Sequence, residues 1–169
     1  VFALKSTFGF AGKFLTGDRK TVPISRTLHT LAVSINGKTQ TNNGIMFDEL
    51  SKYKDNDHFF LRSNDDLKAV CNAPSKNGIF LIYSLNRGRI EMVYIGCTDV
   101  SLEMEGLKNQ IVSRDEFLKR KIKEEGADAL DIYWYVTNTA KKVDNPKEIE
   151  LKILQRHMEI YRTMPRWNK

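Results

Sequence analysis

Two hydrophobic runs with the composition of β-strands lie close together in the second half of the chain. Gly78–Leu85 and Ile90–Ile95 are rich in Ile, Leu, Tyr and other residues that favour strands. The residues between them, Asn86–Arg89, are polar and include a glycine, which suits a tight turn. The pattern therefore predicts an antiparallel hairpin. A further run, Asp131–Thr137, predicts a third strand.

Two amphipathic segments with capping signals predict helices in the same half. Ser113–Glu116 has the spacing of a capping box, an apolar stripe follows it, and Gly126 suits the end of a helix. The last helix is expected to begin at Asn145, which can cap it, with Pro146 at the first helical position. Its apolar spacing continues to about Tyr161.

The first half of the chain has weaker patterns. Leu31–Ile35 followed by Asn36–Gly37 predicts a strand that runs into a tight turn, because Asn-Gly tolerates positive φ. Phe47–Tyr53 and Asp65–Val70 predict short helices, the second with an Asx cap at its start.

Turn-forming residues cluster over Asn72–Gly78, directly before the predicted hairpin. We therefore expect an N-terminal extension over residues 1–72 and a separate domain over residues 73–169. The elements together predict an α+β fold in which helices flank a small, three-stranded antiparallel sheet.

The composition limits the kinds of protein and of binding partner to consider. The chain of 169 residues carries a formal net charge of +6, which favours polyanionic partners such as nucleic acid. Its apolar runs are too short to cross a bilayer, so we expect no membrane partner. Cys71 and Cys97 form no CxxC pair, which argues against a zinc module or disulfide scaffold and favours a reduced, cytoplasmic setting.

The order of motifs in the second half resembles the GIY-YIG nuclease superfamily, and in particular its compact, restriction-like bacterial members. The matching features are Gly78–Phe80, Tyr94–Gly96, a following helical segment, a late glutamate at Glu150 and the closing Pro165–Asn168. The resemblance covers about residues 77–169. Its motifs are short, but two β-rich runs at hairpin spacing make the whole pattern more specific than a lone Tyr-Ile-Gly.

The resemblance implies a metal-dependent DNA endonuclease that hydrolyses phosphodiester bonds. In such an enzyme Mg²⁺, or Mn²⁺, is held by a single glutamate, here Glu150, and Tyr94 contacts the attacking water or the phosphate. Phe80 occupies the position of the family's first tyrosine, so the ring is kept and the hydroxyl is lost. Without the resemblance, the sequence favours Tyr94 as an ordinary aromatic residue of a strand.

Glu150 also stands out without the resemblance. Ile153, Leu154 and His157 follow it at helical spacing, so its carboxylate belongs to the apolar stripe that faces the predicted sheet. An unpaired charge there would be costly. The alternative is a half-exposed carboxylate at the rim of the stripe.

The expected arginine is the main departure from the family pattern. When Gly106–Ile111 is aligned with the family, the arginine position falls on Gln110, which has neither the charge nor the bidentate geometry of a guanidinium. Arg114, four residues later, is the candidate substitute. Two explanations stay open: the nuclease is impaired, or the alignment is displaced by about one helical turn.

Double-stranded DNA is the expected partner, and a cutter of symmetric sites is expected to act as a homodimer on DNA. A catalytically inactive DNA-binding protein is the leading alternative, and an RNA-binding or assembly module is a further one. Basic side chains can equally form an ordinary solvated surface. The candidate DNA contacts, besides residues 1–72, are Arg87, Arg89, Lys119, Arg120, Lys121, Lys123 and Asn168.

Overall fold

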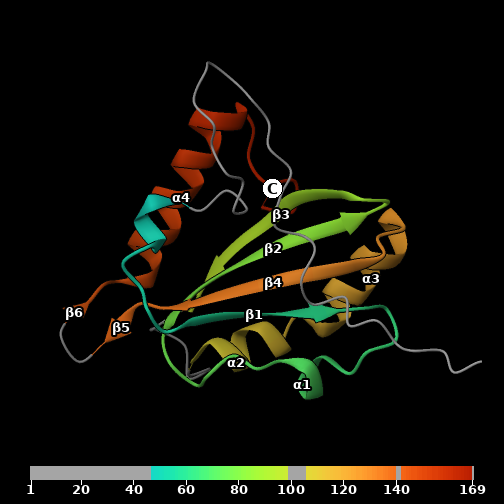
Figure 1. Cartoon of the computed structure of the whole chain (residues 1–169), viewed down its shortest axis with the longest axis horizontal. Helices are drawn as coiled ribbons and strands as arrows, with labels where there is room; N and C mark the ends of the chain where they lie inside the picture. Colours follow the sequence, from blue (N-terminus) through green and yellow to red (C-terminus); the bar gives the residue numbers. More distant parts are fainter. Residues whose placement is uncertain (1–46, 99–105, 140–141, 169) are drawn as a thin grey trace, which may run out of the picture. The chain divides into compact units, whose positions relative to one another are not determined.

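An antiparallel sheet with strand order β1-β4-β2-β3 is the central element of the protein (Figure 1). In this computed structural model the described residues are 47–98, 106–139 and 142–168. The strands of the sheet are β1 (Asn56–Leu61), β2 (Gly78–Asn86), β3 (Arg89–Cys97) and β4 (Ala129–Val136).

Helices flank this sheet, so the predicted α+β class is confirmed. The helical elements are η1 (Asp48–Leu50, a 3-10 turn), α1 (Leu67–Val70), α2 (Gly106–Val112), α3 (Asp115–Glu125) and α4 (Pro146–Tyr161). A separate two-stranded ribbon joins β5 (Asn138–Thr139) to β6 (Lys142–Val143).

The prediction of a three-stranded sheet is wrong, because β1 is a fourth strand. β1 lies beside β4, and its inward residues Phe59 and Leu61 are buried opposite Ile132 and Leu130. Its first half is polar and exposed, as is usual at the edge of a sheet, and this polarity hid the strand in the sequence. From Phe47 onward, the expected extension therefore belongs to the same compact unit as the sheet.

The other sequence predictions have mixed outcomes in the described residues. The hairpin of β2 and β3 is confirmed, and its turn has positive φ at both Arg87 and Gly88, as a type I′ turn requires. α4 is capped by the Asn145 side chain, which accepts a hydrogen bond from the Lys147 N–H at 3.0 Å. Gly126 ends α3 with φ of 60°. The strand expected over residues 31–35 and its turn lie outside the described residues.

Two helix boundaries differ from the prediction. The capping box expected at Ser113 is wrong: its hydroxyl donates back to the carbonyl of Gln110 at 2.9 Å, and Arg114 is the residue at the N-cap of α3. α1 begins only after Asp66, which accepts the capping hydrogen bond from Lys68. The helix expected over residues 47–53 is reduced to the 3-10 turn η1.

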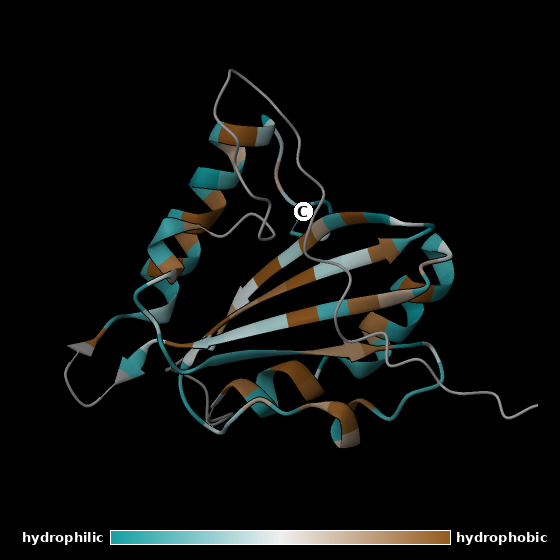
Figure 2. Cartoon of the chain, in the orientation of Figure 1, coloured by the Kyte–Doolittle hydropathy of each residue, from teal (hydrophilic) through white to brown (hydrophobic). Residues whose placement is uncertain are grey.

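The sheet separates two hydrophobic cores, and alternate residues of each strand contribute to each core. Phe80 and Ile82 of β2 face α1, α2 and α3, whereas Ile79 and Leu81 face η1 and α4. Figure 2 shows hydrophobic stretches on the central strands and on α2. Because both faces of β2 are covered, this strand is apolar at nearly every position.

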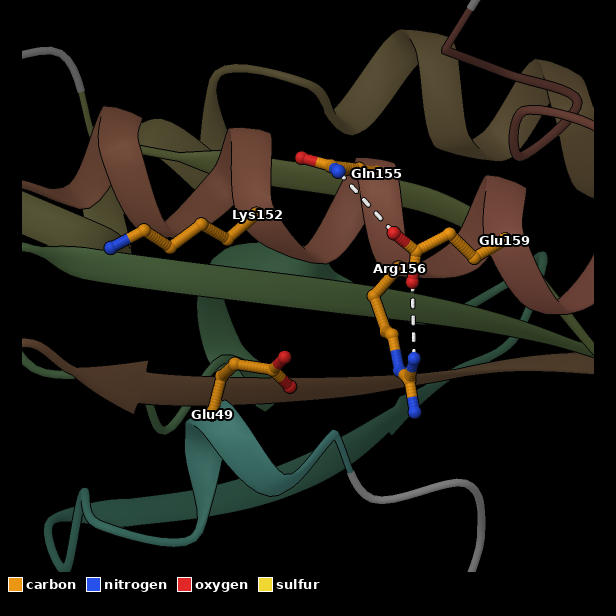
Figure 3. A pocket seen from close by; sticks show the side chains of 5 residues that line it. All are labelled: Glu49, Lys152, Gln155, Arg156 and Glu159. Atoms are coloured by element: carbon orange, nitrogen blue, oxygen red, sulfur yellow. Dashed lines mark hydrogen bonds and ion pairs between the residues drawn. The ribbon is translucent and has the colours of Figure 1, made fainter.

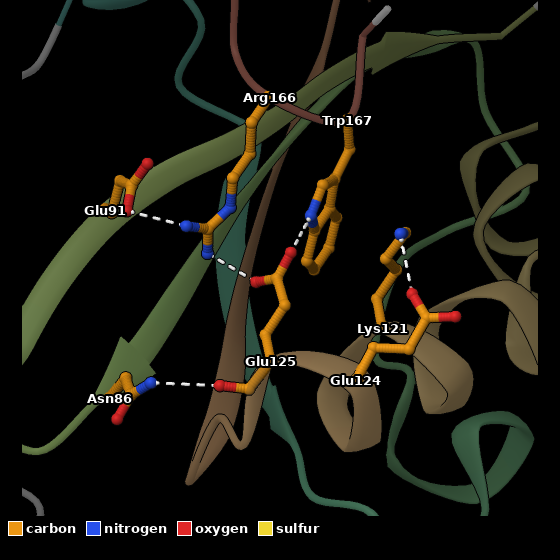
Figure 4. Close-up of polar contacts among 7 residues, drawn as sticks. All are labelled: Asn86, Glu91, Lys121, Glu124, Glu125, Arg166 and Trp167. Atoms are coloured by element: carbon orange, nitrogen blue, oxygen red, sulfur yellow. Dashed lines mark hydrogen bonds and ion pairs between the residues drawn. The ribbon is translucent and has the colours of Figure 1, made fainter.

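The C-terminal segment covers the outer edge of β3. The backbone N–H of Trp167 donates to the carbonyl of Val93 at 2.9 Å, which extends the hydrogen bonding of an otherwise open edge. Arg166 forms ion pairs with Glu91 and Glu125, and the Trp167 indole N–H donates to Glu125 at 2.6 Å (Figure 4). These contacts tie the C-terminal segment to both β3 and α3.

Gly78 gives the first stability prediction. A Cβ atom at this position would lie 2.1 Å from the carbonyl oxygen of Tyr135 and 2.8 Å from Leu107 Cδ1. We expect Gly78→Ala to lower the free energy of unfolding by at least about 2 kcal/mol, because backbone atoms of β4 must move. Urea denaturation measures the change.

Gly88→Asn is the matched control for this substitution. Gly88 has φ of 77°, and within the described part of the chain no atom lies within 4 Å of the added Cβ. Asparagine tolerates this backbone conformation. The control should lose less than about 1 kcal/mol. Equal losses in the two variants would contradict the assignment of Gly78 to a close approach of two backbones.

Candidate active site

Two aromatic rings from β2 and β3 lie side by side on the face that α2 and α3 cover. The ring centroids of Phe80 and Tyr94 are 5.9 Å apart. A β-bulge inserts Val93 into β3, so that Tyr94 pairs with Ile82 and stays on the same face as Phe80. The bulge therefore brings the two aromatic side chains together.

Gly96 makes room for this pair of rings. It pairs with Phe80 across the strands, and a Cβ atom there would lie 2.7 Å from both Phe80 Cζ and Tyr94 Cε1. At Gly78 the close neighbour is the backbone carbonyl of Tyr135. At Gly96 the close neighbours are the two aromatic side chains themselves.

Arg114 lies over both rings. Its guanidinium carbon is 5.3 Å from the centroid of Phe80 and 5.9 Å from that of Tyr94, within the range of cation–π contacts. Its Nη1 also donates to the backbone carbonyl of Gln110 and, at 3.0 Å, to the Gln110 side-chain oxygen. The two rings and Gln110 therefore both orient the guanidinium.

Gln110 and Arg114 make different contacts in this arrangement. Gln110 is only 4% exposed, and its side chain holds the guanidinium rather than facing the rings as a cation would. The chain keeps a helical turn across the gap between α2 and α3, since the Arg114 N–H donates to the Ile111 carbonyl. Residues four apart then share a face, so Arg114 follows Gln110 by one turn.

Glu150 lies at the opposite side of β3, on α4. Its predicted position on the sheet-facing stripe is confirmed, because the residue is only 7% exposed. Its Oε2 accepts hydrogen bonds from Lys147 Nζ at 2.5 Å and from Cys97 Sγ at 3.3 Å. Cys97 directly follows Gly96, so the carboxylate is hydrogen-bonded to the end of the strand that carries Tyr94.

Lys147 is the ion-pair partner of the Glu150 carboxylate. The hydrogen bond with Glu150 raises the pKa of the Lys147 ammonium above its usual value. The ammonium therefore compensates the charge of a carboxylate that is almost completely buried.

The basic residues expected to contact DNA fall into two groups. Arg87, Arg89 and Lys123 are exposed. The other three basic residues lie on α3 and form ion pairs with acidic side chains of the same helix. These pairs reduce the positive electrostatic potential at the three residues. These ion pairs join Lys119 to Asp115 at 2.8 Å, Arg120 to Glu124 at 3.7 Å and Lys121 to Glu124 at 2.8 Å.

Asn168, one of the expected DNA contacts, hydrogen-bonds the backbone of β3. Its Oδ1 accepts from the Ile95 N–H at 2.9 Å, and its Nδ2 donates to the Ile95 carbonyl at 2.7 Å. The side chain thus mimics the backbone of a neighbouring strand and fixes the segment between Tyr94 and Gly96. We assign Asn168 to the positioning of this segment.

Sequence reasoning missed two polar arrangements. Lys147 precedes Glu150 by three residues on a helix, and this spacing of opposite charges was the available signal. His58 of β1 binds Asp131 of β4 through Nδ1 at 2.7 Å and stacks on Tyr133 with 4.7 Å between ring centroids. Burial raises the pKa of Asp131. No local pattern could indicate this pair, because its members are far apart in the sequence.

A hollow between η1 and α4 is separate from these residues (Figure 3). Within it the Gln155 amide and the Arg156 guanidinium both bind the Glu159 carboxylate, at 3.3 and 3.0 Å. The Glu159 carboxylate is therefore already bound by neighbouring side chains of α4. The lining residues are Glu49, Lys152, Gln155, Arg156 and Glu159.

The residues around Glu150 fit a hard divalent cation as a site with one protein ligand, in which water or phosphate oxygens would supply the others. They supply one carboxylate, and Mg²⁺ commonly binds one or two carboxylates with water and phosphate oxygens. Over residues 47–98, 106–139 and 142–168, no group of three or more His, Cys, Asp or Glu side chains is arranged to hold a metal ion. The same residues include no helix long and apolar enough to span a membrane.

Comparisons with known proteins add no neighbour to this description. No family model, no curated protein and no solved structure matches the chain.

Asn168 gives a prediction about the edge of β3. In Asn168→Ala, the Ile95 amide loses its acceptor, so its hydrogen exchange with solvent should become about 10-fold faster. Nuclear magnetic resonance measures this rate residue by residue. The amide of Ile132, in the interior strand β4, is the internal control.

Asn168→Asp separates the two hydrogen bonds of this side chain. It keeps the acceptor for the Ile95 N–H and loses the donor to the Ile95 carbonyl, so most of the protection should remain. An unchanged Ile95 rate in Asn168→Ala would contradict the positioning role.

Proposed function

We propose that the protein is a metal-dependent, restriction-like DNA endonuclease of the cytoplasm that hydrolyses phosphodiester bonds at the end of β3. One observation carries this proposal: the Arg114 guanidinium lies over the rings of Phe80 and Tyr94. A nuclease of the resembled kind needs a guanidinium, a phenol and a carboxylate around one phosphate. The Glu150 carboxylate is hydrogen-bonded to Cys97, at the end of the strand that carries Tyr94.

Arg114 is suited to bind the scissile phosphate. A guanidinium donates two parallel hydrogen bonds to non-bridging phosphate oxygens and keeps its charge at every physiological pH. Because Gln110 and the rings already orient it, little reorganisation is needed as negative charge develops in the transition state. This side chain would neutralise the phosphate and fix its direction.

Tyr94 and Glu150 would complete the reaction centre. With Phe80 in place of the first tyrosine, Tyr94 is the phenol available to orient the attacking water by hydrogen bonding. Glu150 would hold Mg²⁺ or Mn²⁺ together with phosphate oxygens and water. A bound divalent cation supplies charge that stabilises the phosphate and the leaving oxyanion.

Phe80 would position Arg114 through its ring and would not transfer a proton. It is completely buried, and its ring supports the guanidinium of Arg114 from below. The loss of a hydroxyl at this position leaves the geometry of the cation intact. Any slowing of cleavage would therefore come from the missing phenol, and not from a missing arginine.

Double-stranded DNA is the proposed substrate, with basic residues around the site as phosphate contacts. The formal net charge of +6 and the exposed Arg87, Arg89 and Lys123 support this choice. One reaction centre per chain cuts one strand at a time, so cleavage of both strands favours a homodimer on DNA. Residues 1–72 remain proposed as a further source of DNA contacts.

A DNA-binding protein that no longer cleaves is the second candidate. Phe80 lacks the hydroxyl of the family's tyrosine, and Lys147 occupies the carboxylate that would hold the metal ion. Both candidates predict DNA binding that weakens as salt increases. Only the nuclease function predicts cleaved DNA.

Cleavage of supercoiled plasmid with Mg²⁺ tests the nuclease directly. The wild-type protein should produce nicked and linear DNA, and a chelator should stop the reaction. Glu150→Gln and Arg114→Lys should each lower the rate by about 10²-fold or more, because each removes a preorganised charge or its geometry. Agarose gels quantify the products over time.

Two nearby substitutions serve as matched controls for this experiment. Glu148→Gln removes an exposed carboxylate from the same helix as Glu150, and Arg120→Lys changes an exposed cation on the same helix as Arg114. Both should cleave within about 2-fold of the wild-type rate, as exposed sites usually tolerate such changes. DNA binding without cleavage by any variant would favour the second candidate, and neither binding nor cleavage would contradict both.

A further inference from the structure

Lys147 reaches from solvent to a carboxylate that is almost completely buried. The Lys147 side chain is 64% exposed and that of Glu150 only 9%, yet Nζ and Oε2 are 2.5 Å apart. A buried carboxylate is costly without a compensating charge. Lys147 therefore acts as the counter-ion of Glu150.

A divalent cation bound to Glu150 would compete with this ammonium. Two like charges within a few ångströms repel each other strongly where solvent screening is reduced. Cys97 also donates to the same oxygen of Glu150, so the space around Oε2 is already shared. Lys147 would have to move before a metal ion could take its position.

We propose that Lys147 is an internal cation that a divalent metal ion displaces from Glu150, and that the released ammonium binds a phosphate of the DNA. This inference rests on the proposed nuclease function and adds a residue to it. Lys147 then couples two binding events: it leaves the carboxylate when the metal ion arrives, and DNA stabilises the position to which it moves.

The chemistry of lysine suits such an exchange. Its ammonium is a compact charge on a flexible four-carbon chain, whereas the planar guanidinium of Arg114 is fixed by Gln110. The exposed start of α4 leaves the Lys147 chain free to move. Its side chain is 64% exposed, so a phosphate can reach the released ammonium from solvent.

The coupling predicts cooperative binding of metal and DNA. If DNA attracts Lys147 away from Glu150, it raises the affinity for the metal ion, and the metal ion must raise the affinity for DNA by the same factor. An ion pair with one exposed partner corresponds to about a 10-fold difference in affinity at most. That factor is the expected size of the effect.

Titration calorimetry with Mn²⁺ on the full chain tests the inference. In Lys147→Met, removal of the competing cation should tighten Mn²⁺ binding in the absence of DNA by about 10-fold. Lys147→Arg should bind Mn²⁺ as weakly as the wild-type protein, because the competing charge is retained. A duplex oligonucleotide should tighten binding to the wild-type protein more than to Lys147→Met.

Two further variants separate the inference from the proposed function. Lys152→Met removes another lysine of α4, one that lines the separate hollow, and should leave the Mn²⁺ affinity unchanged. Glu150→Gln should lose Mn²⁺ binding. Circular dichroism checks that each variant is folded, and Lys147→Gln replaces Lys147→Met if the latter is not.

The outcomes distinguish two kinds of failure. If Glu150→Gln loses Mn²⁺ but Lys147→Met binds it no more tightly than the wild-type protein, the role of Lys147 is wrong and the metal site stands. If Glu150→Gln binds Mn²⁺ like the wild-type protein, the metal site itself is wrong. Absence of Mn²⁺ binding in the wild-type protein and in Lys147→Met alike would overturn both.

Discussion

The pairing of β2 with β3 is the constraint on which the candidate site depends. It places Phe80 opposite Gly96, where the absence of a side chain leaves room for two rings. The bulge at Val93 then turns Tyr94 to the same face. If the register moved by one residue, Tyr94 would face the other core, and Arg114 would have no pair of rings to lie on.

The last residues of β3 are held by other parts of the chain. Asn168 and Trp167 hydrogen-bond the outer edge of β3, so the segment around Tyr94 is paired on both sides. Two residues after Ile95, Cys97 binds Glu150 of α4. The distribution of contacts explains how residues far apart in the sequence meet at one edge of the sheet.

Much of this arrangement could be predicted from local patterns. The hairpin, the cap at Asn145 and the sheet-facing position of Glu150 follow from residue spacing, because strand alternation, capping and helical periodicity are local properties. β1 was missed because an edge strand needs few apolar residues. The position of Arg114 over the rings depends on the backbone conformation between α2 and α3. Residue propensities do not determine whether the helical turn continues across such a break.

Paramagnetic broadening by Mn²⁺ in nuclear magnetic resonance spectra tests most directly whether Tyr94, Cys97 and Glu150 surround one metal site. The effect falls steeply with distance, so substoichiometric Mn²⁺ should first broaden the signals of these three residues. Signals of His58 and Phe60 on β1, at the opposite edge of the sheet, should persist. Broadening that began at β1, or that affected exposed carboxylates throughout the protein equally, would contradict a metal-dependent site at the end of β3.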